Sequence, residues 1–124
     1  MNQDAQLAAA LQGATPLTQV SVRPDVADQG DQPPYVVFAE IAVQDGAYTL
    51  SGESTLVPAR YQIDVYAPTR LAANAIAQSI VEILADTFDA VVLNRQSLFE
   101  PDTRLRRVML DMSIWFEQSS STPT

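Results

Sequence analysis

The stretch that decides the fold is Ala59-Arg60-Tyr61-Gln62-Ile63-Asp64-Val65-Tyr66-Ala67-Pro68-Thr69-Arg70, because its hydrophobic period changes in the middle. Tyr61, Ile63 and Val65 alternate with polar residues, which is the pattern of a strand with one buried face. Pro68 cannot donate a backbone hydrogen bond to a sheet, and Thr69 is a favourable helix N-cap. The stretch therefore predicts that a strand ends and a helix begins within about three residues.

The residues after this joint predict an amphipathic helix from about Arg70 to Phe88. We expect its apolar stripe to lie on a sheet, and this stripe consists of Leu71, Ile76, Ile80, Ile83, Leu84 and Phe88. The opposite stripe is polar, at four-residue spacing, and consists of Asn74, Gln78, Glu82 and Asp86.

Three further strands are predicted from β-branched and aromatic residues and from alternation. The first is Tyr35–Val43, another begins at Val91, and the last and longest is Leu105–Phe116. A turn at Glu100–Thr103 separates the last two strands. Because each strand shows one clean apolar face, we expect helices on one side of the sheet only.

The N-terminal third is less regular. Leu7 and Leu11 stand four apart and Gly13 follows them, so a short helix is expected there. Residues 13–34 form a connector rich in Pro, Asp, Gln and Gly, in which the alternation of Thr18–Val22 allows a short edge strand.

The predicted fold class is therefore α+β, with a four-stranded antiparallel sheet, a short N-terminal helix and one long helix packed on one face. Residues 1–124 form a single domain. Within it, 1–33 is the N-terminal helix and connector, 44–58 is a long hairpin arm, and 118–124 is a polar tail. Tyr48 and Leu50 are placed on one side of the arm and Leu56 on the other. A loop without a partner is an equal alternative for the arm.

Composition removes several classes of function. The chain has no His, no Cys and no Lys, which excludes imidazole bases, thiol chemistry, the usual zinc ligands and a phosphate-binding lysine. The formal net charge of −8 argues against binding nucleic acid through its phosphates. No membrane span and no signal peptide are expected, and no cofactor is implied. We expect the chain to be made in a cytoplasm.

The remaining carboxylates suggest structural roles. Asp64 and Asp111 are expected, with Glu40, on the sheet face turned away from the helix, where they can pair with Arg60 or Arg107. The alternative is a metal site or an acid pair, which we regard as the weaker interpretation.

Aromatic residues point to an interface on the same face. Phe38, Tyr66, Met109 and Trp115 are expected there, interspersed with arginine, as in protein–protein interfaces. Arg104, Arg106 and Arg107 form the basic cluster of the chain, which suits an acidic patch on a partner subunit better than DNA.

Five segments in this order resemble the tail completion proteins of long-tailed bacteriophages, which are also called tail terminators or tail-to-head joining proteins. The resemblance covers roughly residues 34–117, and residues 1–33 lie outside it. Its segments are Pro34–Phe38, Tyr48–Gly52, Arg60–Ala67, Leu98–Thr103 and Arg107–Phe116.

The resemblance implies a non-enzymatic virion protein that forms a ring, usually of six copies, at the head-proximal end of the tail. Its implied partners are further copies of itself, the major tail tube protein and the head–tail connector, with assembly in the host cytoplasm. DNA would pass through the ring without specific binding, since six copies at −8 each give −48 around the axis. The expected interface residues are Tyr48, Leu50, Leu56, Arg60, Asp64, Tyr66, Arg104, Arg106, Arg107 and Trp115.

Two alternatives remain open. One is a neighbouring neck or head-completion connector, or a tail component of a gene transfer agent or contractile injection machine. The other is a small ligand-binding or enzymatic α+β domain that uses Asp64 and Asp111.

Overall fold

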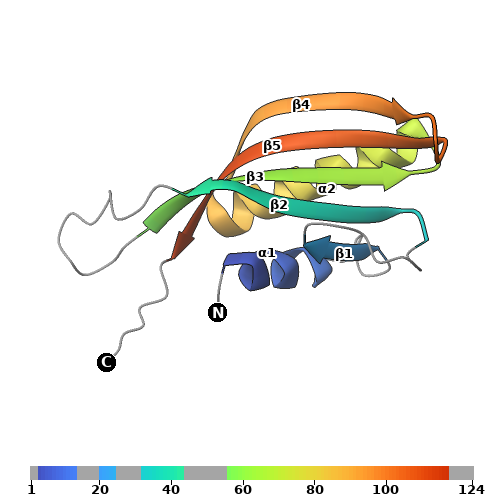
Figure 1. Ribbon diagram of the computed structural model, residues 1–124. Coiled ribbons are helices and arrows are strands. Elements are labelled where there is room, and N and C mark those ends of the chain that lie inside the picture. Colours follow the sequence, from blue (N-terminus) through green and yellow to red (C-terminus); the bar gives the residue numbers. More distant parts are fainter. Residues whose placement is uncertain (1–2, 14–19, 25–31, 44–55, 118–124) are drawn as a thin grey trace.

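The computed structural model describes residues 3–13, 20–24, 32–43 and 56–117 (Figure 1). Two helices and five strands follow one another in an α+β arrangement, as the sequence predicts in its broad class. In chain order they are α1 (Gln3–Gln12), β1 (Ser21–Pro24), β2 (Tyr35–Val43), β3 (Leu56–Ala67), α2 (Arg70–Phe88), β4 (Val91–Glu100) and β5 (Leu105–Glu117).

The sheet has five strands in the order β1-β2-β3-β5-β4, so the prediction of a four-stranded sheet was wrong. It is also mixed and not purely antiparallel, because β1 runs parallel to β2. Val22 stands beside Val36 in the register and is 4% exposed, next to α1. Adding β1 therefore buries an apolar side chain and gives α1 a surface to pack on, which a four-stranded sheet would lack.

Strands β3 and β5 form the centre of the sheet and are longer than their neighbours. β3 begins at Leu56, and Leu56–Pro58 pairs with Trp115–Glu117 of β5 beyond the ends of β2 and β4 (Figure 1). The second side of the predicted arm is thus a continuation of β3. The rest of the arm lies outside the described residues.

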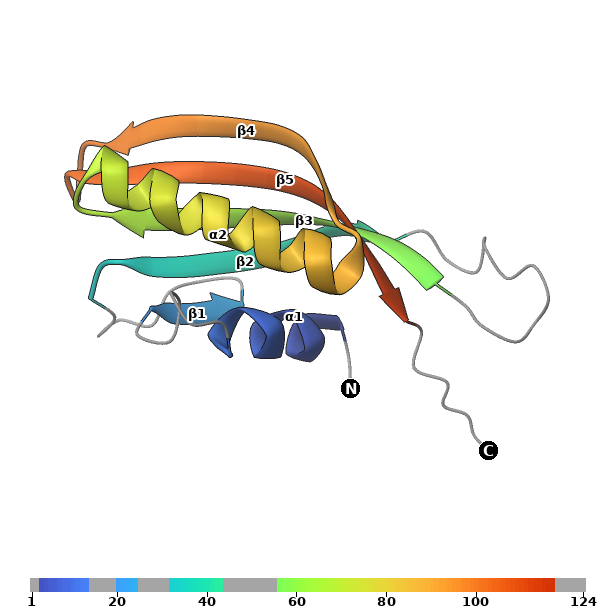
Figure 2. The same cartoon turned by 180° about the vertical axis from the view of Figure 1, so that it is seen from behind.

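The core lies between the sheet and α2, which covers one face (Figure 2). Tyr61 is at its centre, with ring centroids 6.1 Å from Phe38 and 5.7 Å from Phe116. The alternation predicted for the last strand is confirmed, since its even-numbered residues are buried at Val108, Leu110, Met112, Ile114 and Phe116.

The predicted orientation of β2 was wrong. Phe38 is 1% exposed and stands opposite Ile63 in the core. Glu40 is two residues further along β2, opposite Tyr61, so it lies on the same side of the strand as Phe38. Neither therefore lies on the sheet face turned away from α2. Both the odd-numbered and the even-numbered residues of β2 include apolar side chains, so only the pairing with β3 decides which of the two groups is buried.

The helix α2 has the predicted bounds, and the Thr69 hydroxyl accepts a hydrogen bond from the Ala72 N–H at 3.1 Å. Its buried face differs from the predicted stripe, because Leu71 is 82% exposed whereas Ala73 and Ala77 are fully buried. Small side chains let the helix axis approach the sheet closely, so alanine occupies positions that a sequence reading assigns to larger residues.

α2 is also long and apolar enough, by length and composition, to qualify as a membrane span, which the sequence analysis did not anticipate. Ile80 and Leu84 of this helix are fully buried against the sheet. We interpret its apolar composition as that of a core helix.

Candidate assembly surface

The sheet face turned away from α2 carries several of the residues that were predicted from the sequence to form an interface. We call it the outer sheet face, and its members on β3 and β5 are Arg60, Gln62, Asp64, Tyr66, Arg107, Met109 and Asp111. When this face is viewed in Figure 1, α2 lies behind the sheet and α1 lies beside β1 at the sheet's edge. Within the described part of the chain, this face is therefore open to a partner.

Two arginine–aspartate pairs cross the outer sheet face. Arg60 donates from Nε to Asp111 Oδ1 at 2.9 Å and from Nη2 to Oδ2 at 2.6 Å. This two-pronged geometry is the strongest that arginine makes with a carboxylate. The hydrogen bonds from Arg60 hold the pKa of Asp111 below its usual value.

The second pair is more buried. Asp64 is 8% exposed, and its Oδ1 accepts a hydrogen bond from Arg107 Nε at 3.0 Å. Gln62 Nε2 donates to Asp64 Oδ2 at 2.9 Å, so both carboxylate oxygens are satisfied. Burial is the largest single influence on the pKa of Arg107 and acts to lower it, but the hydrogen bond to Asp64 and the nearby charges of Asp64 and Glu100 together leave that pKa raised.

Aromatic rings extend this network toward β2. The Tyr35 and Tyr66 rings stack with centroids 5.0 Å apart, and the Arg107 guanidinium lies 5.7 Å from the centroid of Tyr66. Burial is the main cause that raises the pKa of the Tyr66 hydroxyl. The face is therefore a network of rings and ion pairs whose charges are already compensated.

This geometry does not suit catalysis by Asp64 and Asp111. Each carboxylate accepts a hydrogen bond from an arginine, as the ion-pair interpretation predicts, and Asp64 accepts a second from Gln62. In the described ranges, no group of three acidic side chains could hold a metal ion.

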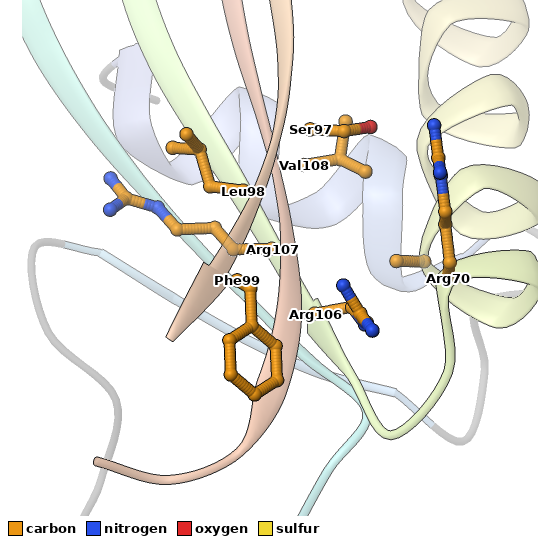
Figure 3. Close-up of a pocket in the computed structure, with 8 residues that line it drawn as sticks. Arg70, Ser97, Leu98, Phe99, Arg106, Arg107 and Val108 are labelled. Carbon is orange, nitrogen blue, oxygen red and sulfur yellow. The ribbon is translucent and has the colours of Figure 1, made fainter. Parts of the chain in front are cut away.

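A second surface is formed by β4, whose ten side chains are all at least partly exposed. A hollow of about 220 Å³ lies between β4, β5 and the first turn of α2 (Figure 3). The Arg106 guanidinium lies 4.6 Å from the centroid of the Phe99 ring, on the side of the sheet that faces α2. The hollow is lined by Arg70, Ala73, Ser97, Leu98, Phe99, Arg106, Arg107 and Val108.

This surface as a whole was not predicted from the sequence, although Arg106 and Arg107 were. The available signal was the absence of clean alternation in Val91–Glu100, which is typical of a strand without a consistently buried face.

The structure divides the predicted basic cluster. Arg107 points to the outer sheet face, whereas Arg106 lies on the side of α2 (Figure 3). Arg104 is exposed in the turn before β5, at a φ of 61°. Arg106 and Arg107 are adjacent on β5 and cannot share one face, because side chains alternate along a strand.

The other predicted interface residues lie in the extension of β3 and β5, where Trp115 continues the outer sheet face, or outside the described residues. Trp115 is half-buried and stands opposite Pro58 in the extension of β3 and β5. Leu56 begins β3 in the same extension. Tyr48 and Leu50 lie outside the described residues, and no role of these four residues is tested.

Residues 2–117 match the model of one protein family, that of the tail completion protein gp17. The chain belongs to this family. The match includes both described helices and all five described strands, so it confirms the resemblance and extends it to residues 2–33. The protein is accordingly a structural component of a phage or phage-like tail.

The fold is also found in a solved particle. A chain in a structure titled "Virion of native gene transfer agent (GTA) particle" is 20% identical, with a TM-score of 0.56. The similarity covers 89% of this chain and 84% of that one. No curated protein matches the sequence.

Proposed function

We propose that the protein closes the head-proximal end of a long phage or phage-like tail as one subunit of a ring. In this role it ends polymerisation of the tail tube and offers a surface to the head connector. The family match over residues 2–117 is the observation that carries the proposal, because it spans the whole described fold.

The chemistry of the chain supports a structural role. The sequence has no His, Cys or Lys, and its two strand carboxylates, Asp64 and Asp111, are paired with arginine. The partners in this proposal are about five further copies of the chain, the tail tube protein and the connector protein. DNA passes through the ring without specific binding.

Self-association and tube binding test the proposal together. In native mass spectrometry and electron microscopy we expect rings of about six copies, and rings bound at one end of purified tail tubes. A protein that stays strictly monomeric, even when mixed with tail tubes, would contradict it.

The outer sheet face is proposed to contact a neighbouring protein in this assembly. Because its charges are paired within the chain, the contact would rest on exposed parts of Tyr66, Met109 and Trp115. The substitution Arg60→Glu reverses the charge at this position and tests the contact. The double variant Arg60→Glu, Asp111→Arg is the control, because it restores an ion pair within the chain. If both variants assemble normally, the face is only solvent-exposed sheet.

A gene transfer agent is the second candidate particle. It is favoured by the structural similarity to a chain of a gene transfer agent virion. Packaged DNA distinguishes the two, because a phage carries its own genome whereas a gene transfer agent carries fragments of its host's DNA. Sequencing DNA from particles that contain this protein decides between them.

A further inference from the structure

The sheet ends differently at its two edges. At one edge β1 has only four residues, ends at Pro24 and packs against α1. At the other edge β4 has ten residues, and its outer side has no strand partner in the described part of the chain. Natural proteins usually shorten or cover sheet edges, because free N–H and C=O groups invite pairing with another strand. Within the ranges that the structure describes, β4 is neither short nor covered by another strand.

The apolar surface of the molecule is concentrated at the same edge. Val91, Leu93, Leu98 and Phe99 are 55%, 53%, 38% and 47% exposed. They make up four of the six large apolar side chains that are exposed among the described residues. Such a concentration is typical of a surface that a partner covers.

Charge distinguishes this edge from the rest of an acidic chain. Four exposed arginines lie on β4 and beside it, namely Arg70, Arg95, Arg104 and Arg106. Arg70, Arg104 and Arg106 form no ion pair with any described residue. Unpaired guanidinium groups next to apolar side chains suit an acidic partner surface.

A surface of the required kind exists on the opposite side of the sheet. β1 pairs only with Tyr35–Phe38, so the outer edge of Ala39–Val43 in β2 has no partner strand in the described ranges. Glu40 and Ile41 are exposed there, and Asp4 lies nearby through its hydrogen bond with Tyr61, which stands opposite Glu40. Among the described residues, this edge therefore combines backbone groups without a partner strand, an apolar side chain and two carboxylates.

We propose that β4 of one copy docks on the Ala39–Val43 edge of β2 in the next copy, so that the sheet continues between subunits. Because the two edges differ and lie at opposite ends of the sheet, the contact repeats head to tail, as a ring requires. A two-fold pairing of β4 with itself is disfavoured, since Arg95 at the middle of the strand would lie close to its own copy. The inference rests on the proposed ring function.

Cysteine cross-linking tests the pairing directly, because the natural chain has no Cys. We would prepare Leu93→Cys, Ile41→Cys and the double variant, each treated with a flexible bis-maleimide. The double variant is expected to give a ladder of covalent oligomers up to the size of the ring, and each single variant is expected to stay uncross-linked. Dimers from Leu93→Cys alone, or no ladder from an assembled double variant, would overturn the pairing.

A disruptive variant gives an independent test. Val91→Asp with Leu93→Asp places two charges in the proposed contact, and self-association should weaken about tenfold or more. Both side chains are more than half exposed, so the circular dichroism spectrum should not change. Ala85→Asp, on the exposed side of α2, is the matched control and should assemble normally.

The two tests separate failure of the inference from failure of the proposed function. If the wild-type chain does not form rings, the proposed function fails and the inference fails with it. If the wild type forms rings and the β4 variant forms them equally well, only the assignment of the interface is overturned.

Discussion

The partners of Asp64 and Asp111 are set by strand register. Arg60 stands opposite Ser113, and Asp111 is two residues away on the same face, so the pair is diagonal across β3 and β5. Arg107 stands opposite Tyr66 and reaches Asp64 in the same diagonal sense. Diagonal neighbours lie about 7–8 Å apart in an antiparallel sheet, a span that an arginine side chain bridges.

Removing the charge of Asp111 should make the free energy of unfolding depend less on pH in the acidic range. Arg60 lowers the pKa of Asp111 in the folded protein. The contribution of the ionised Asp111 to the free energy of unfolding is therefore complete above the unfolded pKa of about 3.9, and it is lost as pH falls through the lower folded pKa. Asp111→Asn should therefore unfold at lower urea than the wild type at about pH 7, with a smaller difference near pH 3.

The control for this prediction is Asp102→Asn. Asp102 is exposed in the turn before β5 and has no ion pair within the described ranges, so its removal should change the urea midpoint little at either pH. An Asp111→Asn deficit of equal size at both pH values would contradict the linkage.

At the scale of elements, α2 ends on an unusual residue. Asp89 adopts the left-handed conformation at φ 54°, and the N–H groups of Asp89 and Ala90 donate to Ala85 and Leu84 carbonyls at 3.1 and 3.2 Å. Glycine is the residue that normally occupies this position, because it has no Cβ to strain. A carboxylate is also unfavourable near a helix C-terminus.

Asp89→Gly should raise the free energy of unfolding by about 0.5–1 kcal/mol. Asp89→Asn is the matched variant, because it removes the charge and keeps a side chain that tolerates the left-handed conformation. Urea denaturation of the three proteins measures both contributions. A glycine variant no more stable than the asparagine variant would show that the backbone conformation costs nothing here.

A hydrogen bond between Tyr61 and Asp4 helps to hold the N-terminal helix to the core. The Tyr61 hydroxyl donates to Asp4 Oδ1 at 2.6 Å, while Leu7 and Leu11 are fully buried. Tyr61→Phe should lower the free energy of unfolding by about 1–2 kcal/mol, because the bond to a carboxylate is lost. Amide hydrogen exchange should accelerate more in α1 than in α2.

Tyr35→Phe is the matched control for this change. Tyr35 is half-buried and stacks on Tyr66, and its ring contact does not need the hydroxyl. Its stability and its exchange rates in α1 should stay close to those of the wild type. Equal effects of the two substitutions would exclude a specific role of the Tyr61 hydroxyl in docking α1.

At the scale of the whole molecule, charge governs the response to DNA. The assembled ring is expected to carry six times the subunit charge of −8, and the proposed contact would cover the arginines at the β4 edge. Assembled protein should therefore leave the electrophoretic mobility of double-stranded DNA unchanged at about 0.15 M salt. A retarded band that disappears with added salt would contradict an inert passage for DNA.

The sequence by itself determined the elements whose hydrophobic period reports a single buried face. The bounds of β2 and α2, the joint at Pro68 and Thr69, and the alternation of β5 all follow from local pattern and capping. The ion-pairing residues of the outer sheet face were also predicted by type, because buried or half-buried carboxylates need a cation.

The tertiary structure alone decided how these elements meet. The parallel position of β1, the burial of Phe38, the exposure of Leu71 and the openness of β4 all depend on neighbours distant in the sequence. When a strand has apolar residues at both odd and even positions, its sequence does not show which side faces the core. The sequence of a short strand does not show whether it runs parallel or antiparallel to its neighbour. Register and packing supply that information, because they determine which side chains leave water.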